Sequence, residues 1–244
     1  MIFSFFRSKK SKDIKSLKVD LHSHLIPSID DGANDIDESI SLIKSLKELG
    51  YQKLITTPHI MSDSYKNDAN VIKQGLELIN DRLIQENIDI SIDIAAEYYI
   101  DDGFLDKLQN DQILSINGKY LLFETSYISK PIQLEDTIFA ISSAGYIPLM
   151  AHPERYRYIK DMKQEYYRFK ELGVMFQVNI NSFGGYYGKD AYAKAMFLSK
   201  EGMIDFLGSD THHIKQTQML KNVLRTKEYQ EIFKNNKILN DTLF

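Results

Sequence analysis

The 244-residue sequence contains no cysteine and no tryptophan, and it has only five prolines. Without cysteine there can be no disulfide bond, no thiolate metal site and no cysteine nucleophile. No run approaches the roughly 18 to 20 consecutive apolar residues that a membrane-spanning helix requires. The 30 Lys and Arg residues are outnumbered by 34 Asp and Glu residues, and this mildly acidic balance opposes a role in nucleic-acid binding.

The first residues of the chain differ in composition from the rest. Residues 1–6 (MIFSFF) are apolar, and a cluster of basic residues follows them up to Lys18. A signal peptide has its positive charges before a longer apolar run, so this order predicts no export and a cytoplasmic protein. We expect residues 1–16 to be a flexible N-terminal tail and residues 17–244 to be one domain. A weak peripheral contact of residues 1–18 with an anionic membrane is the alternative interpretation of the tail.

Apolar segments of strand length alternate with amphipathic helices along the rest of the chain. Strands are predicted at 17–21, 53–57, 91–96, 120–123, 147–151, 174–180 and 204–207. Helices are predicted at 36–49, 72–83, 131–144, 161–172, 189–201 and 216–235, while 101–119 is poorly periodic. Seven strand-helix units predict an α/β fold with parallel strands, most simply a distorted seven-unit TIM-like barrel. An open doubly wound sheet is the alternative, which the lack of a glycine-rich phosphate loop disfavours.

Potential metal ligands follow these strands in a regular way. All six histidines come directly after apolar segments: His22, His24, His59, His152, His212 and His213. Four carboxylates have equivalent positions: Asp31, Glu97, Glu124 and Asp210. Because the carboxyl ends of parallel strands converge on one face of a barrel, we expect these side chains to be neighbours. His213 is the exception, since a residue adjacent to His212 is expected to point elsewhere.

Four neighbouring carboxylates would repel one another without a cation. Several divalent ions would balance them and leave a site that attracts an anion such as phosphate. Imidazole and carboxylate ligands without thiolate suit manganese, iron, zinc or magnesium. The sequence therefore predicts a metal centre at the strand ends.

The motifs DLHSHLIPSIDDG, TTPH, AAEYY, FET, AHPERY and GSDTHH occur in this order. This series resembles the polymerase-and-histidinol-phosphatase (PHP) superfamily. Within it, the chain is most similar to the manganese-dependent bacterial protein-tyrosine phosphatases of the CpsB and YwqE type, which are associated with capsule and exopolysaccharide synthesis. The resemblance runs from about residue 18 to the C-terminal helices. It implies a distorted seven-unit PHP barrel that holds three metal ions, most simply manganese.

The resemblance also implies a role for individual residues. The three implied ligand sets are His22, His24, Glu97 and Asp210 for one metal, then Glu97, Glu124 and His152, with Glu97 bridging, for a second, and Asp31, His59 and His212 for a third. Arg155 matches the phosphate-contacting arginine of the family, whose planar fork can bind two phosphoryl oxygens. Relatives often carry a second arginine after the SDxH motif, and here Lys215 would have to replace it.

The implied activity is hydrolysis of phosphotyrosine, with the Tyr-rich tail of a bacterial tyrosine kinase as the substrate. Water with a metal-lowered pKa would attack phosphorus, which agrees with the lack of cysteine. Either His212 or a metal-bound water would protonate the leaving phenolate.

Three other functions stay open at this point. One is a small-molecule phosphatase of the histidinol-phosphate kind. Another is a nuclease or polymerase-editing module, which the acidic composition opposes. The third is a catalytically weak module that binds a kinase through its tail.

Overall fold

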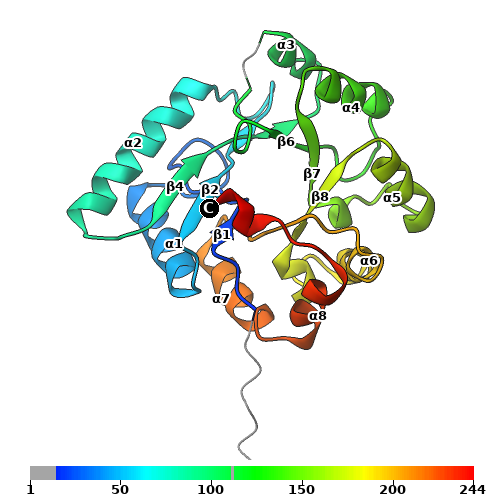
Figure 1. Cartoon of the computed structure of the whole chain (residues 1–244). Helices are drawn as coiled ribbons and strands as arrows, with labels where there is room; N and C mark the ends of the chain where they lie inside the picture. Colours follow the sequence, from blue (N-terminus) through cyan, green and yellow to red (C-terminus); the bar gives the residue numbers. More distant parts are fainter. Residues whose placement is uncertain (1–14, 111–112) are drawn as a thin grey trace, which may run out of the picture.

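The computed structural model describes residues 15–110 and 113–244, so most of the predicted tail at 1–16, and of the membrane contact at 1–18, lies outside the described residues. Short strands lie in the interior and helices surround them (Figure 1). The strands are β1 (Val19–Asp20), β2 (Lys53–Thr56), β3 (His59–Ile60), β4 (Ser91–Ile94), β5 (Glu97–Tyr99), β6 (Tyr120–Glu124), β7 (Ile147–Ala151), β8 (Met175–Asn179) and β9 (Phe206–Gly208). The predicted α/β class is confirmed.

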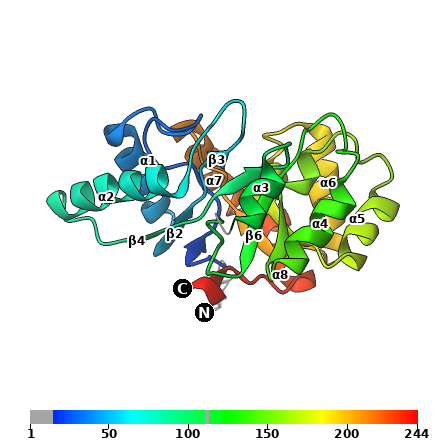
Figure 2. The ribbon, with the colours of Figure 1, turned by 90° about the horizontal axis from the view of Figure 1, so that it is seen from above.

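The α-helices alternate with these strands for most of the chain. They are α1 (Ile36–Glu48), α2 (Ala69–Gln85), α3 (Phe104–Gln109), α4 (Leu134–Ser143), α5 (Met162–Glu171), α6 (Lys189–Lys200), α7 (Ile214–Val223) and α8 (Lys227–Asn235). Three 3₁₀ turns complete the described elements: η1 (Pro153–Arg155), η2 (Ile180–Gly184) and η3 (Asn240–Leu243). In the view from above, most helices lie outside the strands, and the C-terminus lies at the lower edge of the picture (Figure 2).

Parts of the predicted secondary structure form more elements than expected. The described part of the chain forms nine strands rather than seven, because the segments at 53–60 and 91–99 are each interrupted once. Pro58 lies in the first interruption, and proline has no amide hydrogen to donate to a neighbouring strand. The predicted helical region at 216–235 is two helices, since the side chain of Thr226 accepts a hydrogen bond from the Tyr229 amide and begins α8.

The strands form two sheets in which every pair is parallel. One sheet has the order β1-β2-β4, and the other has the order β3-β5-β6-β7-β8-β9. The first and last strands are joined just beyond their ends, where Ser23 and Thr211 form an isolated parallel bridge. There the His24 amide donates to the Thr211 carbonyl at 3.0 Å. The carboxyl ends of the two sheets therefore meet.

The opposite ends of the strands are covered by the C-terminal turn η3. Asn240 is fully buried, and its amide group binds two strands at once. Its Nδ2 donates to the carbonyls of Val19 and Leu207, at 3.0 and 2.7 Å, and its Oδ1 accepts from the Leu207 amide at 2.9 Å. This contact holds β1 beside β9 at the end remote from the histidines.

Replacing Asn240 with alanine should lower the free energy of unfolding by about 2 to 4 kcal/mol, because it leaves buried backbone groups of β1 and β9 without partners. Chemical denaturation would measure the loss. Thr242→Ala on the same turn is the matched control, since the Thr242 hydroxyl binds a carbonyl at an exposed position. Equal effects of the two substitutions would contradict this account of the turn.

Asp20 forms a second contact between β1 and the chain after β9. Its carboxylate accepts from the Ser209 amide at 2.8 Å and from the Ser209 hydroxyl at 2.5 Å. Burial raises the pKa of Asp20 to about 6, although the bonds from Ser209 lower it. The folded state therefore holds a proton that the unfolded state has already released between about pH 4 and 6.

The contribution of Asp20 to stability should consequently fall as the pH rises through this window. We expect the stability of Asp20→Asn relative to the parent protein to improve by about 1 to 3 kcal/mol between pH 4 and 7. Urea denaturation of metal-free protein across this range measures the difference. A difference that stays constant with pH would show that Asp20 does not titrate there.

Candidate metal centre

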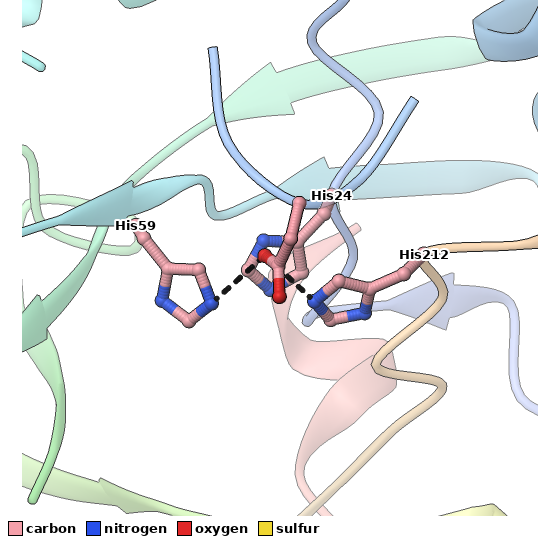
Figure 3. Close-up of side chains that lie close together, drawn as sticks. His24, His59 and His212 are labelled. Atoms are coloured by element: carbon pink, nitrogen blue, oxygen red, sulfur yellow. Dashed lines mark ion pairs between the residues drawn. The ribbon is translucent and has the colours of Figure 1, made fainter. Parts of the chain in front are cut away.

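The structure brings the nine predicted ligands together at the carboxyl ends of the strands. They come from the ends of β1, β6, β7 and β9, from the positions just after β2 and β4 where β3 and β5 begin, and from the loop before α1: His22, His24, Asp31, His59, Glu97, Glu124, His152, Asp210 and His212. Figure 3 shows His24, His59 and His212 converging from different segments. The side chains are buried or nearly so, except that of Asp31, which is 54% exposed.

The hydrogen bonds of His22 and His24 fix which ring nitrogen faces the cluster. Nδ1 of His22 lies 2.7 Å from Oε1 of Gln177, and Nδ1 of His24 lies 2.8 Å from Oδ2 of Asp30. Both partners are acceptors, so Nδ1 carries the hydrogen and Nε2 of each neutral ring presents a lone pair. The two Nε2 atoms lie only 3.3 Å apart. Two lone pairs this close repel each other unless a cation lies beside them.

Glu97 is the central carboxylate of the cluster. It is fully buried, and neither of its oxygens forms a hydrogen bond among the described residues. Its Oε2 lies 3.3 Å from Nε2 of His22 and 3.1 Å from Nδ1 of His59, and its Oε1 lies 2.9 Å from Nε2 of His152. Burial would raise the pKa of Glu97, but the surrounding imidazoles hold it well below its usual range. A buried anion without hydrogen bonds requires a cation.

The pKa values of the imidazoles also indicate that the cluster requires positive charge. Burial would lower the pKa of His24, but the Asp30 carboxylate raises it to about 10. The carboxylates of Glu97 and Asp210 likewise raise the pKa of His22 despite its burial. The protein alone must therefore bind protons to balance its carboxylates. Divalent ions would supply the same charge and would compete with those protons.

A second group surrounds Asp31 at the more exposed side of the cluster. Its Oδ1 lies 3.4 Å from Nε2 of His59 and 3.5 Å from Nε2 of His212, the two contacts that are dashed in Figure 3. Nδ1 of His212 lies 3.0 Å from the main-chain carbonyl of Asp210, so it carries the hydrogen and leaves Nε2 as the lone-pair nitrogen.

Together these side chains offer overlapping sets of ligand atoms, with all atoms of a set within 4.8 Å of one another. The sets are His24, Asp31, His59 and His212; His22, Glu97 and His152; His22, His24 and Asp210; and His59, Glu97 and Glu124. Lone-pair nitrogens beside carboxylate oxygens fit divalent metal ions well. The shared members mean that several ions could lie close together.

Asp210 connects the metal ligands to Arg155. Its Oδ2 accepts from Nδ2 of Asn179 at 2.6 Å, from the Tyr187 hydroxyl at 3.2 Å and from a guanidinium nitrogen of Arg155 at 3.0 Å. Its Oδ1 faces Nε2 of His22 at 3.6 Å. The three donors thus hold the carboxylate so that the other oxygen points at the imidazoles.

The guanidinium of Arg155 lies between two aromatic rings. Its central carbon is 4.5 Å from the ring centre of Tyr127 and 4.4 Å from that of Tyr187. Two ring faces stabilise the cation and restrict its plane. Its ion-pair partner is Asp210, whose Oδ2 lies 3.0 Å from a guanidinium nitrogen.

Two residues of the centre have unusual backbone conformations. His152 has a φ of 32°, and Asp210 has a φ of 50°. Positive φ values cost non-glycine residues about 1 kcal/mol or more and occur preferentially at functional sites. Here His152 follows β7 directly and Asp210 lies two residues after the end of β9, and both side chains face the cluster.

Three polar residues that support the ligands were not predicted as site residues. Asp30 accepts from Nδ1 of His24 and from the His59 amide. Gln177 also accepts from the His152 amide at 3.3 Å, and its Nε2 donates to Oδ1 of Asn179 at 2.9 Å. Both amides are fully buried in β8, at alternate positions of a strand read as apolar. That alternation of polar groups was the signal available in the sequence.

The metal centre opens into a cavity of about 1160 Å³. Six of the predicted ligands form one wall: Asp31, His59, Glu124, His152, Asp210 and His212. Arg155, Tyr127 and Tyr187 line it as well.

Lys215 is not among the lining residues, so the structure does not place it as a second phosphate contact. His213 lines the cavity but belongs to none of the ligand sets found among the described residues.

The fold and the site define a class of α/β proteins in which parallel strands present a histidine and carboxylate metal centre at their carboxyl ends. Comparison with known proteins identifies the family. The model of the CpsB/CapC family of capsular polysaccharide synthesis matches residues 18–237, and the chain belongs to this family. The predicted resemblance is confirmed. None of the described helices is long and apolar enough to cross a membrane.

Two curated relatives and a solved structure illustrate the similarity. Tyrosine-protein phosphatase YwqE of Bacillus subtilis is 33% identical over 81% of this chain and 78% of its own length. Tyrosine-protein phosphatase CpsB of Streptococcus agalactiae is 24% identical over 80% of this chain and 83% of its own. A crystal structure from work on YwqE of Bacillus subtilis and CpsB of Streptococcus pneumoniae, described as metal-dependent tyrosine phosphatases, superposes with a TM-score of 0.78. It is 30% identical and covers 90% of this chain and 96% of that one.

Replacing Gln177 with methionine should weaken metal binding by about 10- to 100-fold, because His22 loses the acceptor that keeps Nε2 unprotonated. Titration calorimetry with Mn²⁺ and elemental analysis after dialysis would measure the loss. Gln164→Met, at an exposed position of α5, is the matched control. An unchanged Mn²⁺ affinity for Gln177→Met in folded protein would contradict the role of the amide.

Proposed function

We propose that this protein is a metal-dependent protein-tyrosine phosphatase. The observation that carries the proposal is the cluster around Glu97, where lone-pair nitrogens face a buried carboxylate without hydrogen bonds and a cavity opens beside Arg155. The tyrosine phosphatases YwqE and CpsB, to which the chain is similar, support the same conclusion. The lack of cysteine excludes a thiolate nucleophile, and we propose that water attacks phosphorus directly.

We propose three divalent ions, with manganese as the first choice. His22, His24, Glu97 and Asp210 would hold one ion, Glu97, Glu124 and His152 a second, and Asp31, His59 and His212 a third. Such ions lower the pKa of water and draw charge from phosphoryl oxygens. The overlap of the ligand sets at Glu97 supports the bridging role of that carboxylate.

Arg155 is proposed to bind the phosphoryl group. Its guanidinium is held at the cavity wall by Asp210 and by the rings of Tyr127 and Tyr187, and the bond to Asp210 uses only one of its nitrogens. The remaining N–H groups can donate to two phosphoryl oxygens. Because the rings fix the guanidinium plane before substrate binds, the arginine loses little freedom on binding.

His212 suits a ligand role better than the role of proton donor. Its Nδ1 hydrogen is bound to the Asp210 carbonyl, and its Nε2 faces Asp31. Neither nitrogen is left to donate to a leaving phenolate. The proposal therefore assigns that proton to water.

The finer architecture and the partner are also part of the proposal. We take the two sheets as one distorted barrel of seven strand-helix units, which the bridge between Ser23 and Thr211 supports. The substrate is proposed to be the Tyr-rich tail of a bacterial tyrosine kinase, and the family's connection with capsular polysaccharide synthesis supports this choice. An extended tail fits a wide cavity better than a closed pocket would.

The decisive test is turnover of a phosphotyrosyl peptide by protein that has been stripped of metal and reloaded with Mn²⁺. We expect hydrolysis only in the loaded form, with kcat reduced at least 100-fold in Glu97→Gln and in Arg155→Lys. Lys163→Gln on α5 is a control for the loss of a surface charge, since Lys163 is exposed and does not line the cavity.

Histidinol phosphate serves as the competing substrate in the same assay. A higher kcat/KM for histidinol phosphate than for the peptide would favour the small-molecule phosphatase. Negligible turnover of both after reloading would overturn an enzymatic function altogether.

A further inference from the structure

The cavity beside the metal centre has more positive charge than phosphate binding requires. Three further cations line it, namely Arg157, Lys160 and Lys189, and we call them the basic rim. All three side chains are exposed, and none forms an ion pair within the described residues. Of the residues that the structure describes, Asp190 is the one acidic lining residue outside the proposed ligands, and Lys194 binds it at 2.7 Å. The rim therefore keeps its full positive charge.

The rim lies beside the position at which Arg155 would hold a phosphoryl group. Arg157 follows two residues after Arg155, and its amide donates to the Tyr127 carbonyl at 2.7 Å, next to the ring that covers one face of the guanidinium. Lys189 follows two residues after Tyr187, whose ring centre lies 4.4 Å from the central carbon of the guanidinium. The cations thus belong to the two segments that enclose Arg155.

Within the proposed function, these charges have no partner in the reaction itself. The phosphoryl group would be neutralised by the metal ions and Arg155, which leaves the rim available for other anions. The cavity, at about 1160 Å³, exceeds the usual range of pockets that enclose one small ligand. It therefore has room for residues that flank a phosphotyrosine.

We propose that the basic rim selects phosphotyrosyl peptides with anionic residues within about three positions of the phosphotyrosine. This inference rests on the proposed phosphatase function and adds to it the charge of the substrate sequence. The anion can be the carboxylate of Asp or Glu, or a neighbouring phosphotyrosine, since both offer oxygens to Arg and Lys. Exposed ion pairs are individually weak and are screened by salt, so the preference should be moderate and strongest at low ionic strength.

The test compares peptides of equal length that differ only in their flanks. One has Asp and Glu beside the phosphotyrosine, one has Asn and Gln, and one has a second phosphotyrosine. The metal-loaded full chain should favour the acidic peptide over the neutral one about tenfold in kcat/KM at low salt. About 0.5 M NaCl should remove most of this ratio.

A triple substitution of the rim, Arg157→Gln, Lys160→Gln and Lys189→Gln, should reduce the acidic-to-neutral ratio to about one. The matched control is Lys73→Gln, Lys200→Gln and Lys237→Gln, which removes the same charge from exposed positions outside the cavity and should keep the ratio. A ratio near one in the parent protein, or an unchanged ratio in the rim variant, would overturn the proposal. A larger preference for the doubly phosphorylated peptide would support it and identify phosphate as the preferred anion.

Fluorescence anisotropy of the labelled peptides separates this inference from the proposed function. If no peptide is hydrolysed but the acidic peptide still binds more tightly through the rim, the result contradicts the phosphatase function and supports the role of the basic rim. If all peptides are hydrolysed and bound equally well, the result contradicts the role of the basic rim and supports the phosphatase function.

Discussion

The structure depends on a concentration of imidazoles and carboxylates that must bind added positive charge, either protons or divalent ions. In the neutral rings, the Nε2 lone pairs of His22 and His24 face each other across 3.3 Å, and the fully buried Glu97 beside them has no hydrogen bond within the described part of the chain. In a water-poor environment both contacts are costly without positive charge. Protons on the imidazoles balance the site in the protein alone, and divalent ions would replace those protons. The rest of the fold serves to hold the groups in this arrangement.

The support for the ligands comes from buried polar groups rather than from the apolar core. Asp30 orients His24, Gln177 orients His22, and Asn179 orients Asp210. The bond between Gln177 and Asn179 links two ligands from opposite ends of the sequence through a single strand. Gly208 leaves room for these contacts, because a Cβ atom at this position would lie 2.6 Å from Nε2 of Gln177 and 2.7 Å from Cβ of His22. The absence of a side chain there lets the amide reach the imidazole.

The cavity has two walls that differ in charge and would bind different groups. The ligand wall is acidic and rigid, and it suits ions that neutralise it. The opposite segments present Arg155 between Tyr127 and Tyr187, and then the basic rim. Asp210 joins both walls, since one oxygen faces the imidazoles and the other accepts from Arg155. A change in the charge of either wall would therefore reach the other through one carboxylate.

The sequence by itself determined the α/β class, the alternation of strands and helices, and the choice of histidines and carboxylates that the structure brings together as a candidate metal site. These follow from local properties, because apolar periodicity and the position of a residue after a strand can be read along the chain. It did not determine that Gln177 and Asn179, within a strand read as apolar, would orient His22 and Asp210. It also left open which carboxylate Arg155 would pair with, and whether Lys215 would line the cavity. Only the tertiary structure decided these points, because each depends on the distance between side chains from segments far apart in the sequence, which no local pattern encodes.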